Sequence, residues 1–173
     1  MDKTLVSART PSGFEDWIVH SSDEEPWVVV AESADGRSFE GRGQDLFRAL
    51  QQVCGQLETE GVRLCCNGAR VNARPSPAAS GAGGGMVYLL PALRNPTMRD
   101  LVPLLSPAPC ERVGTVEEQE EFWRRRQARS WQAALRQVNP LTMVGRRAGR
   151  FLGIPRWRAD VDGDVTRWRR VGC

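Results

Sequence analysis

Residues 16–41 read DWIVHSSDEEPWVVVAESADGRSFEG and decide the fold of the first part of the chain. The runs 16–20 and 27–31 are rich in β-branched and aromatic residues, which favour strands, and the acidic stretch between them is typical of a loop. An Asp-Gly pair then supplies a tight-turn signal, after which 38–41 can return as a third strand. These residues predict an antiparallel meander.

The period of the apolar residues changes after the meander. Between residues 45 and 60 they recur at spacings that place them on one face of a helix, and Gly61 supplies a C-terminal stop. The residues on that face are Leu46, Leu50, Val53, Cys54 and Leu57. The sequence therefore predicts one main helix at 45–60 that covers the sheet.

A second hairpin is predicted around Asn67 and Gly68, because both central positions of a two-residue hairpin turn favour positive φ. Its strands would be 62–66 and 69–73. The segment 75–85 that follows consists mainly of Pro, Ser, Ala and Gly, which predicts a mobile surface loop.

Three further segments complete the first part of the chain. The apolar run 86–90 predicts a strand, Thr97 can cap a short helix that reaches residue 105, and the proline-rich stretch 106–109 is typical of a linker. The predicted fold class is α+β, with a mostly antiparallel sheet of about six strands packed by one main helix and followed by a basic helical C-terminal extension.

The C-terminal region begins with a strong helix signal. Thr115 and Glu118 match a capping box, which predicts a helix from 116 to about 138. An Asn-Pro pair then breaks this helix, and a second, amphipathic helix is predicted at 141–152. Two short strands about an Asp-Gly turn are predicted between 157 and 168.

Charge divides the chain into an acidic and a basic part. Residues 1–121 carry 11 positive and 18 negative side chains, whereas 122–173 carry 13 arginines and three aspartates. Lys3 is the only lysine, which indicates a GC-rich genome, so the abundance of arginine is weak evidence of nucleic-acid binding. We expect an acidic α+β domain at 1–110 and a basic, mainly helical arm with a terminal hairpin at 111–173.

The basic arm carries the candidate partner-binding residues. Arginine interleaved with tryptophan can pair with acidic side chains, neutralise phosphates or stack on bases. Four glutamates precede the first arginines at helical spacings, so pairing within the helix and a plain solvated surface are competing explanations. The candidates are Trp123, Arg124, Arg125, Arg126, Arg129, Trp131, Arg146, Arg147 and Arg150.

The sequence offers no cofactor or metal site. His20 is the only histidine, and no Cys-x-x-Cys occurs. The glycines of 81–85 lead into a β-like segment rather than a helix, unlike a phosphate-binding loop. The aspartates of 160–164 lack the spacing of a calcium loop. We expect no cofactor and no structural metal.

Cysteine usage and the lack of a targeting signal bear on the compartment. Five cysteines, two of them adjacent, do not resemble a spaced disulfide framework, so all five are expected to be reduced. The amino terminus lacks a secretory signal, and no apolar stretch approaches the length of a membrane span. We expect a cytoplasmic protein with no stable membrane insertion.

Residues 14–123 resemble small single-domain proteins of unknown function from GC-rich bacteria. The resemblance rests on DLFRAL at 45–50, LCCNGAR at 64–70, Pro75-Ser76, the glycines 83–85 and VGTVEEQ at 113–119. It implies a compact bacterial α+β domain, carries no site over, and ends where the basic extension begins.

These features favour a non-enzymatic protein-protein interaction module of the immunity, adaptor or complex-subunit kind that docks a partner through its basic arm. The partner would be another protein with an acidic surface, or a second copy of the chain. The alternative is a nucleic-acid-binding accessory protein that uses the Arg- and Trp-rich C-terminal region. An enzyme that pairs His20 with a serine or cysteine ranks third.

Overall fold

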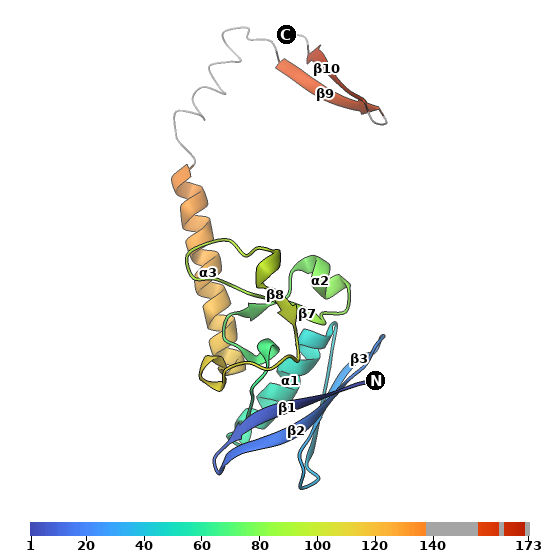
Figure 1. Cartoon of the computed structure of the whole chain (residues 1–173). Helices are drawn as coiled ribbons and strands as arrows, with labels where there is room; N and C mark the ends of the chain where they lie inside the picture. Colours follow the sequence, from blue (N-terminus) through green and yellow to red (C-terminus); the bar gives the residue numbers. More distant parts are fainter. Residues whose placement is uncertain (138–155, 163–164, 172–173) are drawn as a thin grey trace. The chain divides into compact units, whose positions relative to one another are not determined.

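In the computed structural model of the protein, which describes residues 1–137, 156–162 and 165–171, five strands form a curled antiparallel sheet (Figure 1). They are β1 (Asp2–Thr10), β2 (Gly13–Ser21), β3 (Trp27–Glu32), β4 (Ser38–Gly43) and β5 (Arg63–Leu64). Their order across the sheet is β4-β3-β2-β1-β5. The predicted meander is therefore confirmed, and β1 extends it at one side.

The sequence predicts no strand at β1, because its small and polar residues weaken the alternation of apolar and polar side chains that marks a strand. Val6, Ala8 and Thr10 are buried, whereas Leu5 and Ser7 between them are exposed. This alternation places one face of the sheet in the core and leaves the other open to solvent.

The main helix, α1 (Leu46–Thr59), confirms the prediction for 45–60 and covers the inner face of the sheet. The Asp45 side chain caps it by accepting a hydrogen bond of 2.7 Å from the backbone amide of Arg48. Gly61 follows the helix with φ +73°, a conformation that suits glycine. The helix packs Leu50, Val53 and Leu57 against Val6, Trp17, Val19, Val29 and Ala31 of the sheet.

Asn67 and Gly68 do not form the predicted hairpin. They begin a 3-10 turn, Asn67–Ala69, and Gly68 has no positive φ. A Cβ on Gly68 would lie only 2.5 Å from methyl carbons of both Leu50 and Leu104. The glycine is therefore required by close packing rather than by a turn.

A second, three-stranded sheet has the order β6-β7-β8. It contains β6 (Ala73–Arg74), β7 (Met86–Leu89) and β8 (Leu101–Pro103), and β7 confirms the strand predicted at 86–90. Thr97 caps only a 3-10 turn, Met98–Asp100, because the chain then enters β8 instead of continuing as the predicted helix. The strands β1–β8 exceed the six that were predicted.

Part of the segment predicted as a mobile loop forms a short helix, α2 (Pro77–Gly81). Ser76 caps it through a 3.1 Å hydrogen bond from the amide of Ala79, and the Ser80 hydroxyl donates to a carboxylate oxygen of Asp45. The same carboxylate caps α1, so Asp45 ties the two helices together.

The expectation of five reduced cysteines is wrong, because Cys65 and Cys110 form a disulfide with Cα atoms 4.9 Å apart. Residues that were predicted to be a linker run beside Cys65, whose carbonyl accepts a 2.9 Å hydrogen bond from the amide of Ala108. This pairing places Cys110 beside β5, although 45 positions separate the two cysteines in sequence. Cys54 and Cys66 are free thiols.

The chain divides into two compact units, Met1–Arg126 and Gln127–Cys173, and α3 (Val116–Gln137) runs from the first into the second. The predicted capping box starts α3: the Thr115 hydroxyl accepts from the amide of Glu118 at 3.1 Å, and the Glu118 carboxylate accepts from the amide of Thr115 at 2.8 Å. In the second unit β9 (Arg156–Asp162) and β10 (Val165–Val171) pair antiparallel, which confirms the predicted hairpin. The helix predicted at 141–152 lies outside the described residues.

Candidate functional site

The first turns of α3 are fixed to the first unit by a buried amide. The Gln119 side-chain nitrogen donates to the carbonyl oxygens of Gly68 and Arg70, both at 2.7 Å, and its oxygen accepts from Gln51 at 3.0 Å. Gln119 is 5% exposed, so these hydrogen bonds satisfy groups that water does not reach.

Ionic contacts anchor the next residues of the helix. One carboxylate oxygen of Glu120 accepts from Arg48 at 3.1 Å and from Arg74 at 2.9 Å. Partial burial acts to raise the pKa of Glu120, but the hydrogen bonds from the two arginines outweigh it, and the pKa is lowered. The Arg74 guanidinium also lies 4.9 Å from the centre of the Trp123 ring, so one face of this candidate tryptophan has a partner within the chain.

The three consecutive arginines that the sequence singled out have different surroundings. Arg124 and Arg125 both pair with Glu121 on the same helix, yet their side chains remain 73% and 70% exposed. Arg126 instead donates to the carbonyl oxygens of Pro91 and Arg94, and these hydrogen bonds hold the loop that follows β7 against α3. Of the three, only Arg124 and Arg125 are therefore mostly exposed to solvent.

Arg129 is exposed one turn beyond Arg125. We call Arg124, Arg125 and Arg129 the basic α3 face. Of the other candidates, Trp131 lies on α3 with its side chain outside the description, and Arg146, Arg147 and Arg150 lie outside the described residues.

The third possibility from the sequence is an enzyme in which His20 activates a serine or cysteine nucleophile. Within the described residues, no hydrogen bond joins His20 to a serine or cysteine side chain. Burial raises the pKa of Cys54 well above its usual value and that of Cys66 to about 11, which keeps both as thiols at neutral pH. His20 lies on the outer face of the sheet, where its Nε2 atom is 3.4 Å from a carboxylate oxygen of Glu32.

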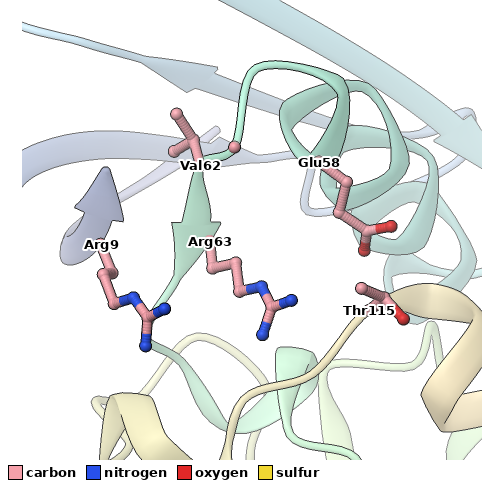
Figure 2. Close-up of a pocket in the computed structure, with 6 residues that line it drawn as sticks. Arg9, Glu58, Val62, Arg63 and Thr115 are labelled. Carbon is pink, nitrogen blue, oxygen red and sulfur yellow. The ribbon is translucent and has the colours of Figure 1, made fainter. Parts of the chain in front are cut away.

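A pocket of about 170 Å³ lies where β1 and β5 meet the end of α1 and the start of α3 (Figure 2). We call it the arginine pocket; its lining residues are Arg9, Glu58, Gly61, Val62, Arg63 and Thr115. The antiparallel pairing of β1 with β5 places Arg9 directly opposite Arg63. No local pattern could reveal this pair, because the two arginines come together only through a contact between distant strands.

The polar groups of the arginine pocket are partly used by the fold. The Glu58 carboxylate accepts a 2.8 Å hydrogen bond from the amide of Val116, the first residue of α3. Arg9 and Arg63 make no ion pair within the part of the chain that the structure describes. The pocket thus contains two guanidinium groups and one carboxylate that already caps a helix.

No protein-family model matches the chain, and neither does any curated protein sequence. Among the residues that the structure covers, no group of three or more His, Cys, Asp or Glu side chains is arranged to hold a metal ion. None of the helices described here is both long and apolar enough to cross a bilayer.

Proposed function

We propose that the protein is a non-enzymatic interaction module that docks an acidic surface of another protein through the basic α3 face and the basic residues beyond it. The observation that carries this proposal is the contrast along α3. Gln119 and Glu120 fix the start of the helix to the first unit, whereas Arg124 and Arg125, one turn later, are mostly exposed.

This arrangement suits recognition of acidic side chains. Arg124 and Arg125 belong to the first unit and follow the anchored residues Gln119 and Glu120 by about one turn, so they lose less freedom on binding than they would on a free peptide. Their pairs with Glu121 are exposed and therefore weak, and a carboxylate of a partner can compete for them. Charge complementarity of this kind speeds association and selects partners by sign.

Two observations support a binding role over catalysis. Burial keeps Cys54 and Cys66 in the unreactive thiol form, and Cys65 and Cys110 are joined to each other.

Nucleic acid is a less favoured partner because the guanidinium of Arg74 covers a face of Trp123, which bases would otherwise use for stacking.

The test uses the full chain and two probes of equal charge, a fluorescent glutamate-rich peptide and a short DNA duplex. The variant R124Q/R125Q/R129Q removes the basic α3 face, and K3Q/R42Q/R99Q removes the same charge from exposed positions outside α3. We expect the first variant to bind the peptide roughly tenfold more weakly at low salt, the sum of three exposed charge contacts, and the second to bind like the parent. Fluorescence anisotropy measures both affinities.

Three outcomes would contradict the proposal. One is equal weakening by both variants, which would show that only net charge matters. Another is tight duplex binding with no peptide binding, which would move the nucleic-acid function into first place. The third is concentration-dependent dimerisation of the unliganded protein, lost in R124Q/R125Q/R129Q by sedimentation analysis, which would make a second copy the partner.

A further inference from the structure

We propose that the arginine pocket binds a tetrahedral oxyanion, either free phosphate or a phosphate monoester group. This site lies in the first unit and does not depend on the basic α3 face or on the proposed function.

The pocket brings two like charges together. Arg9 and Arg63 are directly opposite each other on neighbouring antiparallel strands, an arrangement that destabilises a sheet when nothing neutralises it. Most other arginines of the first unit have a carboxylate partner within 4 Å: Arg37, Arg42, Arg48, Arg74, Arg94, Arg124 and Arg125. An anion between Arg9 and Arg63 would remove the repulsion.

Both guanidinium groups line the same pocket. Figure 2 shows the guanidinium groups of Arg9 and Arg63 extending from their strands toward the segment that leads into α3. Thr115 lines the same pocket, but its hydroxyl oxygen, which accepts from the amide of Glu118, points away from the two guanidinium groups (Figure 2). The donors of the pocket are therefore the two guanidinium groups from neighbouring strands.

Two further arginines lie near the pocket in the fold but do not line it. Arg70 and Arg112 lie on the paired segments next to Thr115, where the amide of Val71 donates to the carbonyl oxygen of Arg112 at 3.2 Å. Burial lowers the pKa of Arg70, the positive charge of Arg112 lowers it further, and its Nε atom is buried without a partner. The carboxylates of Glu58 and Glu118 oppose these charges, but both are hydrogen-bonded to backbone amides at the positive end of α3.

The size of the pocket suits a small anion. A volume of about 170 Å³ is well below the 300–1,000 Å³ typical of pockets for drug-sized ligands, so the pocket suits a single anionic group rather than a nucleotide. Guanidinium groups bind both carboxylate and phosphate, but a doubly charged tetrahedral anion can neutralise both arginines at once, whereas a carboxylate neutralises only one.

The test is titration of the isotope-labelled full chain with inorganic phosphate, sulfate or acetate at constant ionic strength, followed by NMR. We expect saturable shifts of the Arg9 and Arg63 side-chain N–H signals with phosphate and sulfate, and much weaker ones with acetate. Phosphoserine is a fourth arm: tighter binding than inorganic phosphate would identify a monoester as the ligand, and weaker binding would identify the free anion.

Variants assign the shifts to the pocket. Arg63→Gln and, separately, the more exposed Arg9→Gln should each weaken phosphate binding roughly tenfold or more, the loss expected for one charge-assisted contact. Arg42→Gln removes an exposed arginine of the same sheet and should leave it unchanged. Arg9→Gln keeps the test decisive if Arg63→Gln fails to fold. Non-saturable shifts, equal affinity for acetate, or equal weakening by Arg42→Gln would overturn the site.

Discussion

At the scale of single residues, α3 shows which contacts a sequence can and cannot reveal. Thr115 and Glu118 are three positions apart, so their capping box is visible as a local pattern and is confirmed. Gln119 reads as an ordinary surface residue of a charged helix. Its hydrogen-bond partners lie about 50 positions earlier, at Gly68 and Arg70, and no local pattern encodes them.

We expect Gln119→Ala to lower the free energy of unfolding by roughly 2–4 kcal/mol. The substitution leaves the buried carbonyl oxygen of Gly68 and the Gln51 amide without partners, and each unsatisfied buried group is costly. The Arg70 carbonyl oxygen loses one hydrogen bond but keeps the one from the amide of Ala73. Gln127→Ala, at an exposed position of the same helix, is the control and should change stability little. Urea denaturation measures both, and equal stability of the two variants would contradict this role of Gln119.

Glu120 should make the free energy of unfolding of the protein depend on pH. Its pKa is below the ordinary value of 4.5 in the folded protein, so the unfolded chain takes up the proton first as the pH falls. The stabilisation is complete above about pH 4.5 and is lost as the pH falls through the lowered pKa. Urea denaturation at several pH values should therefore show Glu120→Gln less stable than the parent at pH 7, with the gap closing in acid.

The exposed Glu117→Gln provides the comparison for Glu120, because Glu117 makes no ion pair in the described part of the chain. If the difference in the free energy of unfolding between the parent and Glu120→Gln stays constant from pH 7 to pH 3, Arg48 and Arg74 do not hold this carboxylate in its charged form.

At the scale of elements, α1 and α3 are predictable because their signals are local: a helical period, a cap and a stop. The segment around Gly68 shows why others are not. An Asn-Gly pair has the same local preference whether it forms a turn or packs against Leu50 and Leu104. The tertiary contact decides, and it involves residues that only the fold brings together. The same reason explains α2, which contacts Asp45 through Ser80.

Two glycines provide a matched test of this packing. Gly68→Ala should destabilise the protein by roughly 1–3 kcal/mol, because its Cβ would overlap methyl groups of Leu50 and Leu104. Gly55→Ala, inside α1 with no atom within 4 Å of the added carbon, should stabilise it by about 0.5–1 kcal/mol. Thermal denaturation compares them, and a change of the same sign in both variants would contradict the packing.

The disulfide links β5 to the segment that leads into α3. It closes a loop of 45 positions, for which loss of chain entropy in the unfolded state gives a stabilisation of up to about 4 kcal/mol. We expect a reductant to lower the stability of the parent protein in urea and to have no effect on the double variant C65A/C110A. Equal stability of the parent with and without reductant would contradict the link.

At the scale of the whole molecule, the sequence reveals the separation of charge but not how individual charges are used. Arg124, Arg125 and Arg126 are neighbours in sequence, yet the first two are exposed and the third holds a loop through backbone carbonyl oxygens. Arg9 and Arg63 belong to the part of the chain with a net negative charge, yet they meet in one pocket.

The anchoring of α3 also decides how the proposed function is best tested. A chain that ended at Cys110 would lose Gln119 and Glu120 together with the basic arm, so failure to bind could reflect unfolding. Substitution of exposed arginines removes charge while leaving these anchors in place.

The central claim is that the basic α3 face docks an acidic protein. The most direct measurement is quantitative mass spectrometry of the proteins that co-purify with the tagged full chain from its host cells at low salt after nuclease treatment, with R124Q/R125Q/R129Q and K3Q/R42Q/R99Q in parallel. We expect a defined acidic protein that remains bound after nuclease treatment, is lost with the first variant and is retained with the second. Recovery of proteins only while nucleic acid is intact, or equal recovery with both variants, would contradict it.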